Sequence, residues 1–218
     1  MEKGLFIVLE GIDGSGKSTQ ARLLKKSFED YGLPVLQTRE PGGTELGEEI
    51  REILLKDRYQ DKMMDPLTQT LLFHAARQEF LTEVVRPALQ SGVTVIADRF
   101  EPSSFVYQGY VQGVAREVEV LSQLIVGSEF QPNLCVVLDI PPEVSYLRKL
   151  NPDRIGQDLI FEHQGLEFAR KLREGYLEYA KQHPSVVLLD GTQSPDKVHQ
   201  QIVIGLRSLL LLRGLINA

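Results

Sequence analysis

A glycine-rich stretch near the start of the chain has the residue types and spacing for binding phosphate groups. Residues 11–19 read Gly-Ile-Asp-Gly-Ser-Gly-Lys-Ser-Thr, which fits the pattern GxxxxGK[ST]. Glycines let the backbone coil so that successive N–H groups point at phosphate oxygens, and a lysine adds charge for the β and γ phosphates. The predicted ATP-binding residues are Gly11, Ile12, Asp13, Gly14, Ser15, Gly16, Lys17, Ser18 and Thr19.

A glycine-rich turn with an accidental lysine is the simplest alternative to a phosphate-binding loop. Such a match is expected by chance in about one chain of this size in a hundred. The apolar run at 5–9 before the motif and the helical pattern after it make chance less plausible. The dinucleotide fingerprint GxGxxG is not met, because Thr19 stands where its third glycine would fall.

Polar residues also follow the apolar run at 93–97. This run ends at Asp98 and Arg99. An acidic residue at the tip of a strand beside a phosphate loop commonly holds magnesium, so Ser18 and Asp98 are the predicted metal ligands. A structural ion pair between Asp98 and Arg99 is an equally good interpretation of these residues taken alone.

Short apolar runs alternate with helical patterns along the chain, and they indicate how these side chains are positioned. The runs are continuous and rich in β-branched residues, as in a parallel sheet covered on both faces, and lie at 5–9, 35–38, 93–97, 134–140 and 186–189. We predict an α/β, doubly wound fold in one domain over residues 1–218, because no linker divides the chain. Ligands of such sheets bind beyond the carboxyl ends of the strands.

The helical segments are predicted from periodicity and capping residues. A long helix over 67–89 is expected after an Asp65-Pro66 cap, with core positions at Leu67, Leu71, Leu72, Ala75, Leu81, Val84, Val85 and Ala88. Residues 101–104 are expected to form an extended loop. Helices are expected from 142 to 150 and from about 159 to 182, with the most loop-like segment at 148–161.

Composition narrows the class of protein. The chain has 218 residues, 42% hydrophobic and 25% charged, and a net charge of −6, which argues against a nucleic-acid or anionic-membrane partner. The single cysteine, Cys135, lies in an apolar run and is expected to be buried in a strand. The start of the chain passes almost at once into a strand, with no signal-peptide pattern, so a cytoplasmic enzyme is expected.

The order of these motifs resembles the thymidylate kinases, which phosphorylate dTMP with ATP. The matching segments are residues 11–19, Arg39-Glu40-Pro41-Gly42-Gly43-Thr44, Leu71-Leu72-Phe73 with Ala76-Arg77, and Asp98-Arg99-Phe100 with Ser103-Ser104 and Tyr107-Gln108-Gly109. Weaker similarity continues to Asp190-Gly191-Thr192. The resemblance implies a P-loop NTPase three-layer sandwich: a five-stranded parallel sheet with helices on both faces and a small lid at about 148–161.

The resemblance also implies roles for individual residues. Phe73 would stack on thymine, and Arg77 and Gln108 would hydrogen-bond its edge, although Phe73 on an apolar helix would otherwise be taken as core. Ser104 would help to fix the base, and Tyr107 would lie against the sugar. The implied substrate-binding residues are Arg39, Glu40, Arg51, Phe73, Arg77, Arg99, Ser104, Tyr107 and Gln108, of which Arg99, Arg39 and Arg51 would hold the acceptor phosphate.

The implied reaction is Mg²⁺-assisted, in-line transfer of the γ-phosphoryl group of ATP to dTMP, giving dTDP and ADP for dTTP synthesis. The acceptor phosphate is already ionised near neutral pH, so no general base is needed. Asp13 lies among phosphates and must be bridged by a cation: Arg39, Arg99 or Mg²⁺. The expected catalytic residues are Lys17, Asp13, Arg99, Arg148 and Arg154.

Two departures from the family pattern matter for catalysis. Position 14 is glycine, where one branch of the family has an arginine and the other takes its arginine from the lid. The catalytic arginine is therefore expected to be Arg148 or Arg154. The lid segment, at about 148–161, is shorter and less basic than in the bacterial enzymes that this sequence resembles. The choice between the two arginines therefore stays open.

Two other functions compete with this one. A kinase for dUMP or another monophosphate is possible, because one methyl group contributes only about 1–3 kcal/mol of discrimination. A nucleotide-binding switch without catalysis is disfavoured by the intact Lys17, Ser18, Asp98 and Arg99. The resemblance further implies a homodimer, formed through the long helices of the second half or the one beginning near Asp65.

Overall fold

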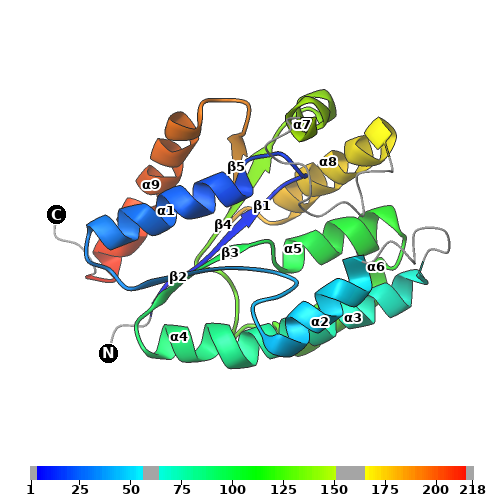
Figure 1. Cartoon of the computed structure of the whole chain (residues 1–218), viewed down its shortest axis with the longest axis horizontal. Coiled ribbons are helices and arrows are strands. Elements are labelled where there is room, and N and C mark those ends of the chain that lie inside the picture. Colours follow the sequence, from blue (N-terminus) through cyan, green and yellow to red (C-terminus); the bar gives the residue numbers. More distant parts are fainter. Residues whose placement is uncertain (1–3, 56–63, 151–164, 215–218) are drawn as a thin grey trace.

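Five parallel strands form the central layer of the molecule, and the segments that carry the predicted site follow their carboxyl ends (Figure 1). A computed structural model of the chain describes residues 4–55, 64–150 and 165–214. The strand order is β2-β3-β1-β4-β5. The strands are β1 (Phe6–Glu10), β2 (Val35–Arg39), β3 (Thr94–Asp98), β4 (Leu134–Asp139) and β5 (Val186–Asp190). The predicted five-stranded parallel sheet is confirmed.

Helices cover both faces of this sheet (Figure 1). In chain order they are α1 (Lys17–Asp30), α2 (Glu45–Leu55), α3 (Pro66–Glu79), η2 (Phe80–Val85), α4 (Arg86–Gln90), α5 (Glu101–Ser104), η3 (Phe105–Val111), α6 (Ala115–Ile125), α7 (Pro142–Lys149), α8 (Gly165–Gln182) and α9 (Pro195–Leu212). The segments η2 and η3 are π-helical. Helices α1 and α9 lie together on one face, and η2 and α4 lie on the other.

Strand β1 is buried along its whole length because it is the middle strand of the sheet. Its side chains alternate between two apolar clusters. Ile7 and Leu9 pack with α1 and α9, whereas Phe6 and Val8 pack with η2. This alternation fixes the register of β1, and so fixes where the glycine-rich loop leaves the sheet.

The helix expected over 67–89 forms, and its predicted core face is confirmed in the second half but not in the first. Leu81, Val84, Val85 and Ala88 pack in the core, whereas Ala75 is exposed. Asp65 caps α3 as expected, accepting hydrogen bonds from the backbone N–H groups of Leu67 and Thr68. Leu67 and Leu71, assigned to the core, are 40% and 49% exposed. The π-helical segment η2, which begins at Phe80, changes the helical phase, so one regularly spaced apolar stripe does not stay buried on both sides of it. The buried face of α3 is mostly polar instead.

Two other expectations differ from the structure. Residues 101–104 form helix α5 rather than an extended loop, because Pro102 occupies a first-turn position where its missing N–H costs nothing. Helix α8 is described from Gly165, and its expected start at about 159 lies outside the described residues. Cys135 is buried in β4 as expected.

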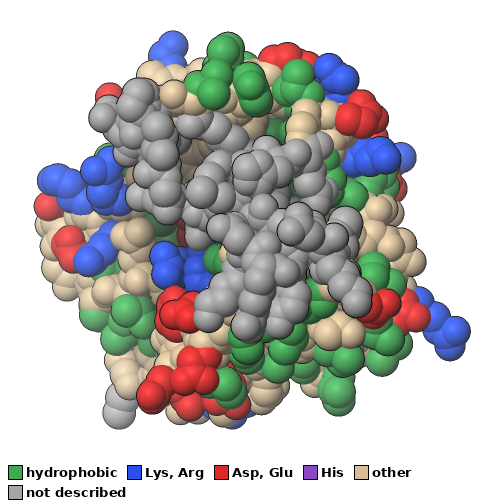
Figure 2. Space-filling model, turned by 45° about the vertical axis from the view of Figure 1, so that its right-hand side comes forward, with side chains coloured by type: hydrophobic (Ala, Val, Ile, Leu, Met, Phe, Trp, Pro, Cys, Tyr) green, Lys and Arg blue, Asp and Glu red, His purple; other side chains and the backbone are tan. Residues whose placement is uncertain are grey.

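The surface carries charged side chains of both signs (Figure 2). On the face seen in Figure 2, acidic and basic side chains are interspersed. None of the helices in the described part of the chain combines the length and apolarity needed to cross a membrane.

Candidate active site

The glycine-rich loop connects the end of β1 to the first turn of α1. Gly11 has a φ of 131°, and a Cβ there would lie 2.5 Å from the carbonyl oxygen of Leu138 in β4. Gly16, at the N-cap of α1, has a φ of 108°. The first turn of α1 contains no acidic residue, so its positive end is left for an anion. The tightly coiled glycine loop followed by a helix, as predicted, is confirmed.

The Lys17 side chain is folded back onto this loop. Its Nζ donates to the backbone carbonyls of Gly11 (3.1 Å) and Ile12 (3.2 Å) and lies 3.9 Å from an Asp13 carboxylate oxygen. Burial, and next the nearby Arg99 charge, lower the pKa of Lys17. An anion such as a phosphate would offset both effects.

Ser18 and Asp98, the predicted metal ligands, are brought together from α1 and the end of β3. The Ser18 hydroxyl donates to Asp98 Oδ2 at 2.6 Å. Both side chains offer oxygen donors, as Mg²⁺ prefers, and Mg²⁺ commonly takes its remaining ligands from water and substrate phosphates. Within the described ranges there is no cluster of three or more His, Cys, Asp or Glu side chains suited to a metal. Ser18 and Asp98 therefore fit a magnesium ion that takes its other ligands from a bound nucleotide and water.

Arg99 forms an ion pair with Asp13. Arg99 follows β3, and its φ of 74° makes it the one non-glycine residue with positive φ in the part of the chain that the structure describes. Its Nη2 donates to Asp13 Oδ1, and its Nη1 contacts the carbonyl oxygen of Gly11 at 3.3 Å. The guanidinium lies 5.3 Å from the centre of the buried Tyr107 ring. Of the two arginines proposed to bridge Asp13, Arg99 pairs with it, whereas Arg39 pairs with Glu48.

Sequence reasoning missed the residues that hold Arg99. Glu10, at the end of β1, is fully buried and accepts hydrogen bonds from the backbone N–H of Phe100 (2.8 Å) and from the Ser103 hydroxyl (2.8 Å). Tyr176 of α8 donates to Glu10 at 2.9 Å. Burial raises the pKa of Glu10, and the Arg99 charge opposes that shift. A glutamate that ends an apolar run directly before Gly11 was the available signal.

Arg77 is the centre of a second polar cluster, on the buried face of α3. It is 1% exposed and forms an ion pair with Glu40 at 2.6 Å. Its Nη2 also donates to the Ser104 hydroxyl at 2.9 Å and to the carbonyl oxygen of Phe100 at 3.2 Å. The structure thus joins Arg77, Glu40 and Ser104, which are far apart in the sequence.

The charge states in this cluster follow from burial. Burial raises the pKa of Glu40 to about 7, and the Arg77 charge opposes that shift. His74, to which no role was assigned, places Nδ1 2.8 Å from the carbonyl oxygen of Thr70 and Nε2 3.3 Å from Arg77 Nη1. Burial, and next Arg77, lower its pKa to about 3, so the neutral ring accepts a hydrogen bond from Arg77.

The other predicted base-binding residues lie beside this cluster. Gln108, on η3, is buried and its Nε2 donates to Gln69 Oε1 of α3 at 3.1 Å. Phe73 is half-buried and packs against Ile50 and Leu54 of α2. The core interpretation of Phe73 is therefore supported, although the residue is not fully buried.

The other described arginines with predicted roles each contact another group of the protein. Arg39 pairs with Glu48 at 3.2 Å on the surface, and Arg51 donates to the carbonyl oxygen of Pro41 at 2.8 Å. Arg148, on the last turn of α7, donates to the carbonyl oxygens of Gly14 and Gly191, both at 3.0 Å. Arg148 therefore braces the phosphate-binding loop. Arg154 lies outside the described residues.

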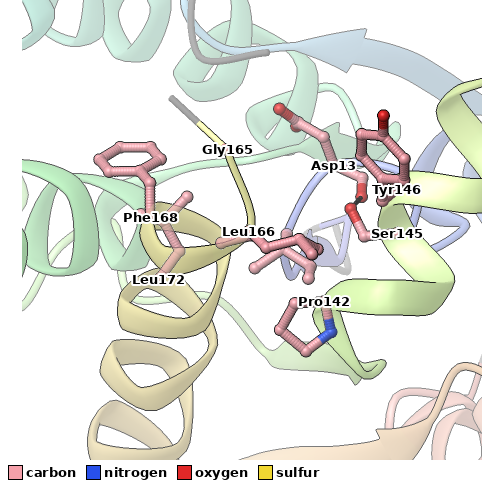
Figure 3. Close-up of a pocket in the computed structure, with 10 residues that line it drawn as sticks. Asp13, Pro142, Ser145, Tyr146, Gly165, Leu166, Phe168 and Leu172 are labelled. Carbon is pink, nitrogen blue, oxygen red and sulfur yellow. Dashed lines mark hydrogen bonds between the residues drawn. The ribbon is translucent and has the colours of Figure 1, made fainter. Parts of the chain in front are cut away.

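A small, mostly apolar pocket lies beside Asp13, between α7 and α8 (Figure 3). It is lined by Ile12, Asp13, Pro142, Ser145, Tyr146, Gly165, Leu166, Phe168, Ala169 and Leu172. The Ser145 hydroxyl donates to the backbone carbonyl of Asp13 at 2.6 Å, which fixes the loop against α7. None of the predicted base-binding residues lines this pocket.

Comparison with known proteins identifies the family to which this arrangement belongs. The family model described as thymidylate kinase matches residues 9–202. The chain belongs to the thymidylate kinase family. It is therefore a phosphotransferase of the nucleoside monophosphate kinase class.

Individual thymidylate kinases are similar over almost the whole chain. The thymidylate kinase of Kosmotoga olearia is 41% identical over 204 residues, which cover 91% of this chain and 93% of that protein. The thymidylate kinase of Methylobacillus flagellatus is 40% identical over 205 residues, covering 92% and 96%. A crystal structure of thymidylate kinase from Ehrlichia chaffeensis superposes with a TM-score of 0.73 at 31% identity, covering 94% of this chain and 99% of that one.

Proposed function

We propose that the chain transfers the γ-phosphoryl group of ATP to dTMP, giving dTDP and ADP. The observation that carries this proposal is the direct ion pair between Arg99 and Asp13, beside Lys17 in the phosphate-binding loop. This pair joins the arginine expected to bind dTMP to the loop expected to bind ATP. The phosphates of ATP, held by the loop, and the phosphate of dTMP, held by Arg99, would then lie next to each other.

The proposed catalysis consists of positioning and charge neutralisation. The monophosphate of the acceptor is largely ionised at neutral pH, so no residue needs to remove a proton. Lys17 would exchange its backbone carbonyl partners for phosphate oxygens, and Arg99 would hold the acceptor phosphate. Mg²⁺, when held by Ser18 and Asp98 with the nucleotide, would neutralise part of the charge shared by the phosphates.

Asp13 has a positioning part in this proposal. A carboxylate next to two phosphates is repelled unless a cation lies between them. The Arg99 guanidinium, whose Nη2 donates to Asp13, would lie between the carboxylate and the phosphates. Asp13 would thereby orient Arg99, and Tyr107 beneath the guanidinium would limit its movement.

Recognition of the base is proposed at the Arg77 cluster. Arg77 Nε is buried and, among the described residues, has no hydrogen-bond partner. A buried donor without a partner is costly, and a carbonyl oxygen of a pyrimidine would satisfy it. Phe73, one turn earlier on α3, would stack on the same ring.

The catalytic arginine of the lid is proposed to be Arg154. Arg148 is committed to two backbone carbonyls, which makes it a brace for the loop and for the turn after β5.

The cytoplasmic location and the use of the product for dTTP synthesis stay predictions from the sequence.

A homodimer is also proposed, through α3 and α6. These helices contact each other and expose Leu67, Leu71, Val120 (58%) and Leu124 (78%). Neighbouring exposed apolar side chains on two packed helices are typical of a surface covered by another protein. The family's usual assembly makes a second copy of this chain the proposed occupant.

The decisive experiment is an assay of ADP release with ATP, Mg²⁺ and dTMP, dUMP, dGMP or UMP in turn. We expect strong turnover with dTMP and weaker turnover with the others, and dTDP identified as the product. Folded protein that binds ATP but turns over none of these acceptors would refute the proposal in favour of a nucleotide-binding switch. Preferred turnover of dUMP would refute only the choice of base.

A further inference from the structure

Tyr176 of α8 contacts the Arg99 guanidinium at Nη1, whereas Asp13 contacts it at Nη2. Its side chain is fully buried, and its hydroxyl contacts Arg99 Nη1 (3.0 Å), Ser103 Oγ (3.0 Å) and Glu10 Oε2 (2.9 Å). No motif of the family resemblance described above includes Tyr176. Tyr176 nevertheless contacts the guanidinium that pairs with Asp13.

At two of the three contacts of the Tyr176 hydroxyl, those with Arg99 and Glu10, the donor and the acceptor follow from the groups involved. A guanidinium has only donors, so the Tyr176 oxygen must accept from Arg99 Nη1. Its single proton is then given to Glu10 Oε2, since a carboxylate has only acceptors. Tyr176 therefore transmits the position of the buried Glu10 to Arg99 in a continuous series of hydrogen bonds.

The backbone around Arg99 is held by the same carboxylate. Arg99 adopts a positive φ, which costs a non-glycine residue of order 1–3 kcal/mol. Glu10 accepts from the backbone N–H of Phe100, the next residue, and so maintains this turn. Glu10 thus fixes the Arg99 backbone directly and its side chain through Tyr176.

We propose that Tyr176 is a positioning residue for phosphoryl transfer. Its hydroxyl holds Arg99 Nη1 so that Nη2 stays directed at Asp13 and the phosphate-binding loop. The kinetic part of this inference rests on the proposed function, in which Arg99 holds the acceptor phosphate. The structural part concerns only the Arg99 guanidinium and does not depend on the substrate.

Tyr179 provides a matched control on the same helix. It is also buried, and its hydroxyl donates to a carboxylate, Glu101 Oε2, at 2.9 Å. Its ring stacks on His183, with 4.0 Å between the ring centres. Tyr179→Phe removes a comparable hydrogen bond without touching the Arg99 cluster.

The kinetic experiment compares Tyr176→Phe with Tyr179→Phe in the full chain. We expect Tyr176→Phe to lower kcat/KM for dTMP about tenfold, as for losing one hydrogen bond to a charged group, with KM for ATP within about twofold of wild type. Tyr179→Phe should keep kcat/KM for dTMP within about twofold, at a similar melting temperature. Equal kinetic losses in both variants, or none in Tyr176→Phe, would overturn the kinetic role.

The structural experiment measures rotation of the Arg99 guanidinium by ¹⁵N NMR. The Arg99 signals are assigned as those lost in Arg99→Lys. We expect restricted rotation in wild type and in Tyr179→Phe, and faster rotation in Tyr176→Phe. Unchanged rotation in Tyr176→Phe would overturn the inference. If wild type does not turn over dTMP, the proposed function fails, and this measurement alone decides whether Tyr176 positions Arg99.

Discussion

Individual carboxyl groups of this site differ in their response to pH because their surroundings differ. Glu40 is buried and has its pKa raised from its ordinary value of 4.5 to about 7. The folded state therefore favours the protonated form, and the stability linked to this proton is present in full below pH 4.5. It is lost as the pH rises toward 7, by roughly 3 kcal/mol at most.

Glu40→Gln should remove this pH dependence. The variant should gain stability relative to wild type as the pH is raised from 5 to 8, measured as the free energy of unfolding in urea. Glu48→Gln, in the adjoining helix, is the control: a hydrogen bond from the Gly43 N–H lowers the pKa of Glu48, so its difference from wild type should not change over this range. A constant difference for Glu40→Gln would show that Glu40 is ionised throughout.

Ser18→Ala tests the pairing of the proposed metal ligands. The substitution removes the hydroxyl that lies 2.6 Å from Asp98, and it should raise the Mg²⁺ concentration needed for half-maximal turnover about tenfold at fixed ATP. Ser27→Ala, farther along α1, should leave the Mg²⁺ titration unchanged, since Ser27 contacts His199. An unaltered Mg²⁺ requirement in Ser18→Ala would remove Ser18 from the proposed metal site.

At the scale of whole elements, α9 carries a glycine that serves no conformational purpose. A Cβ at Gly205 would meet no atom within 4 Å, and its φ is not in the left-handed region. Gly205→Ala should stabilise the protein by about 0.4–1 kcal/mol and raise Tm by about 1–4 °C in a thermal melt. Gly32→Ala has equal space but a φ of 70° and should lower Tm. A lower Tm in Gly205→Ala would contradict this account of α9.

The elements also show which parts of the site could be predicted from the sequence. Strands and the glycine-rich loop were predicted closely, because continuous apolar runs and fixed glycine spacing are local signals. The buried face of α3 was not, because it carries Thr70, His74 and Arg77, whose partners come from other elements. Glu10 was missed for the same reason: only the fold brings it to Ser103 and Tyr176.

At the scale of the whole molecule, the proposed dimer should depend on one apolar surface. Leu124→Glu, on α6, should convert a dimer to a monomer in light scattering after size-exclusion chromatography, because a charge would be buried at the interface. Ile204→Glu on α9 is the control, since Ile204 is 72% exposed on the other side of the sheet. A dimer that persists in Leu124→Glu and dissociates in Ile204→Glu would place the interface on α9.

The strand order has a consequence for how the protein is made. Strand β1 has β3 and β4 as its neighbours, with Val8 opposite Ala97 on one side and Cys135 on the other. The strands that fix the position of the phosphate-binding loop, β3 and β4, are synthesised after the loop itself. Such non-local pairing is slow and must await the later segments. We therefore expect a nascent chain to bind ATP only after β4 (Leu134–Asp139) has emerged from the ribosome.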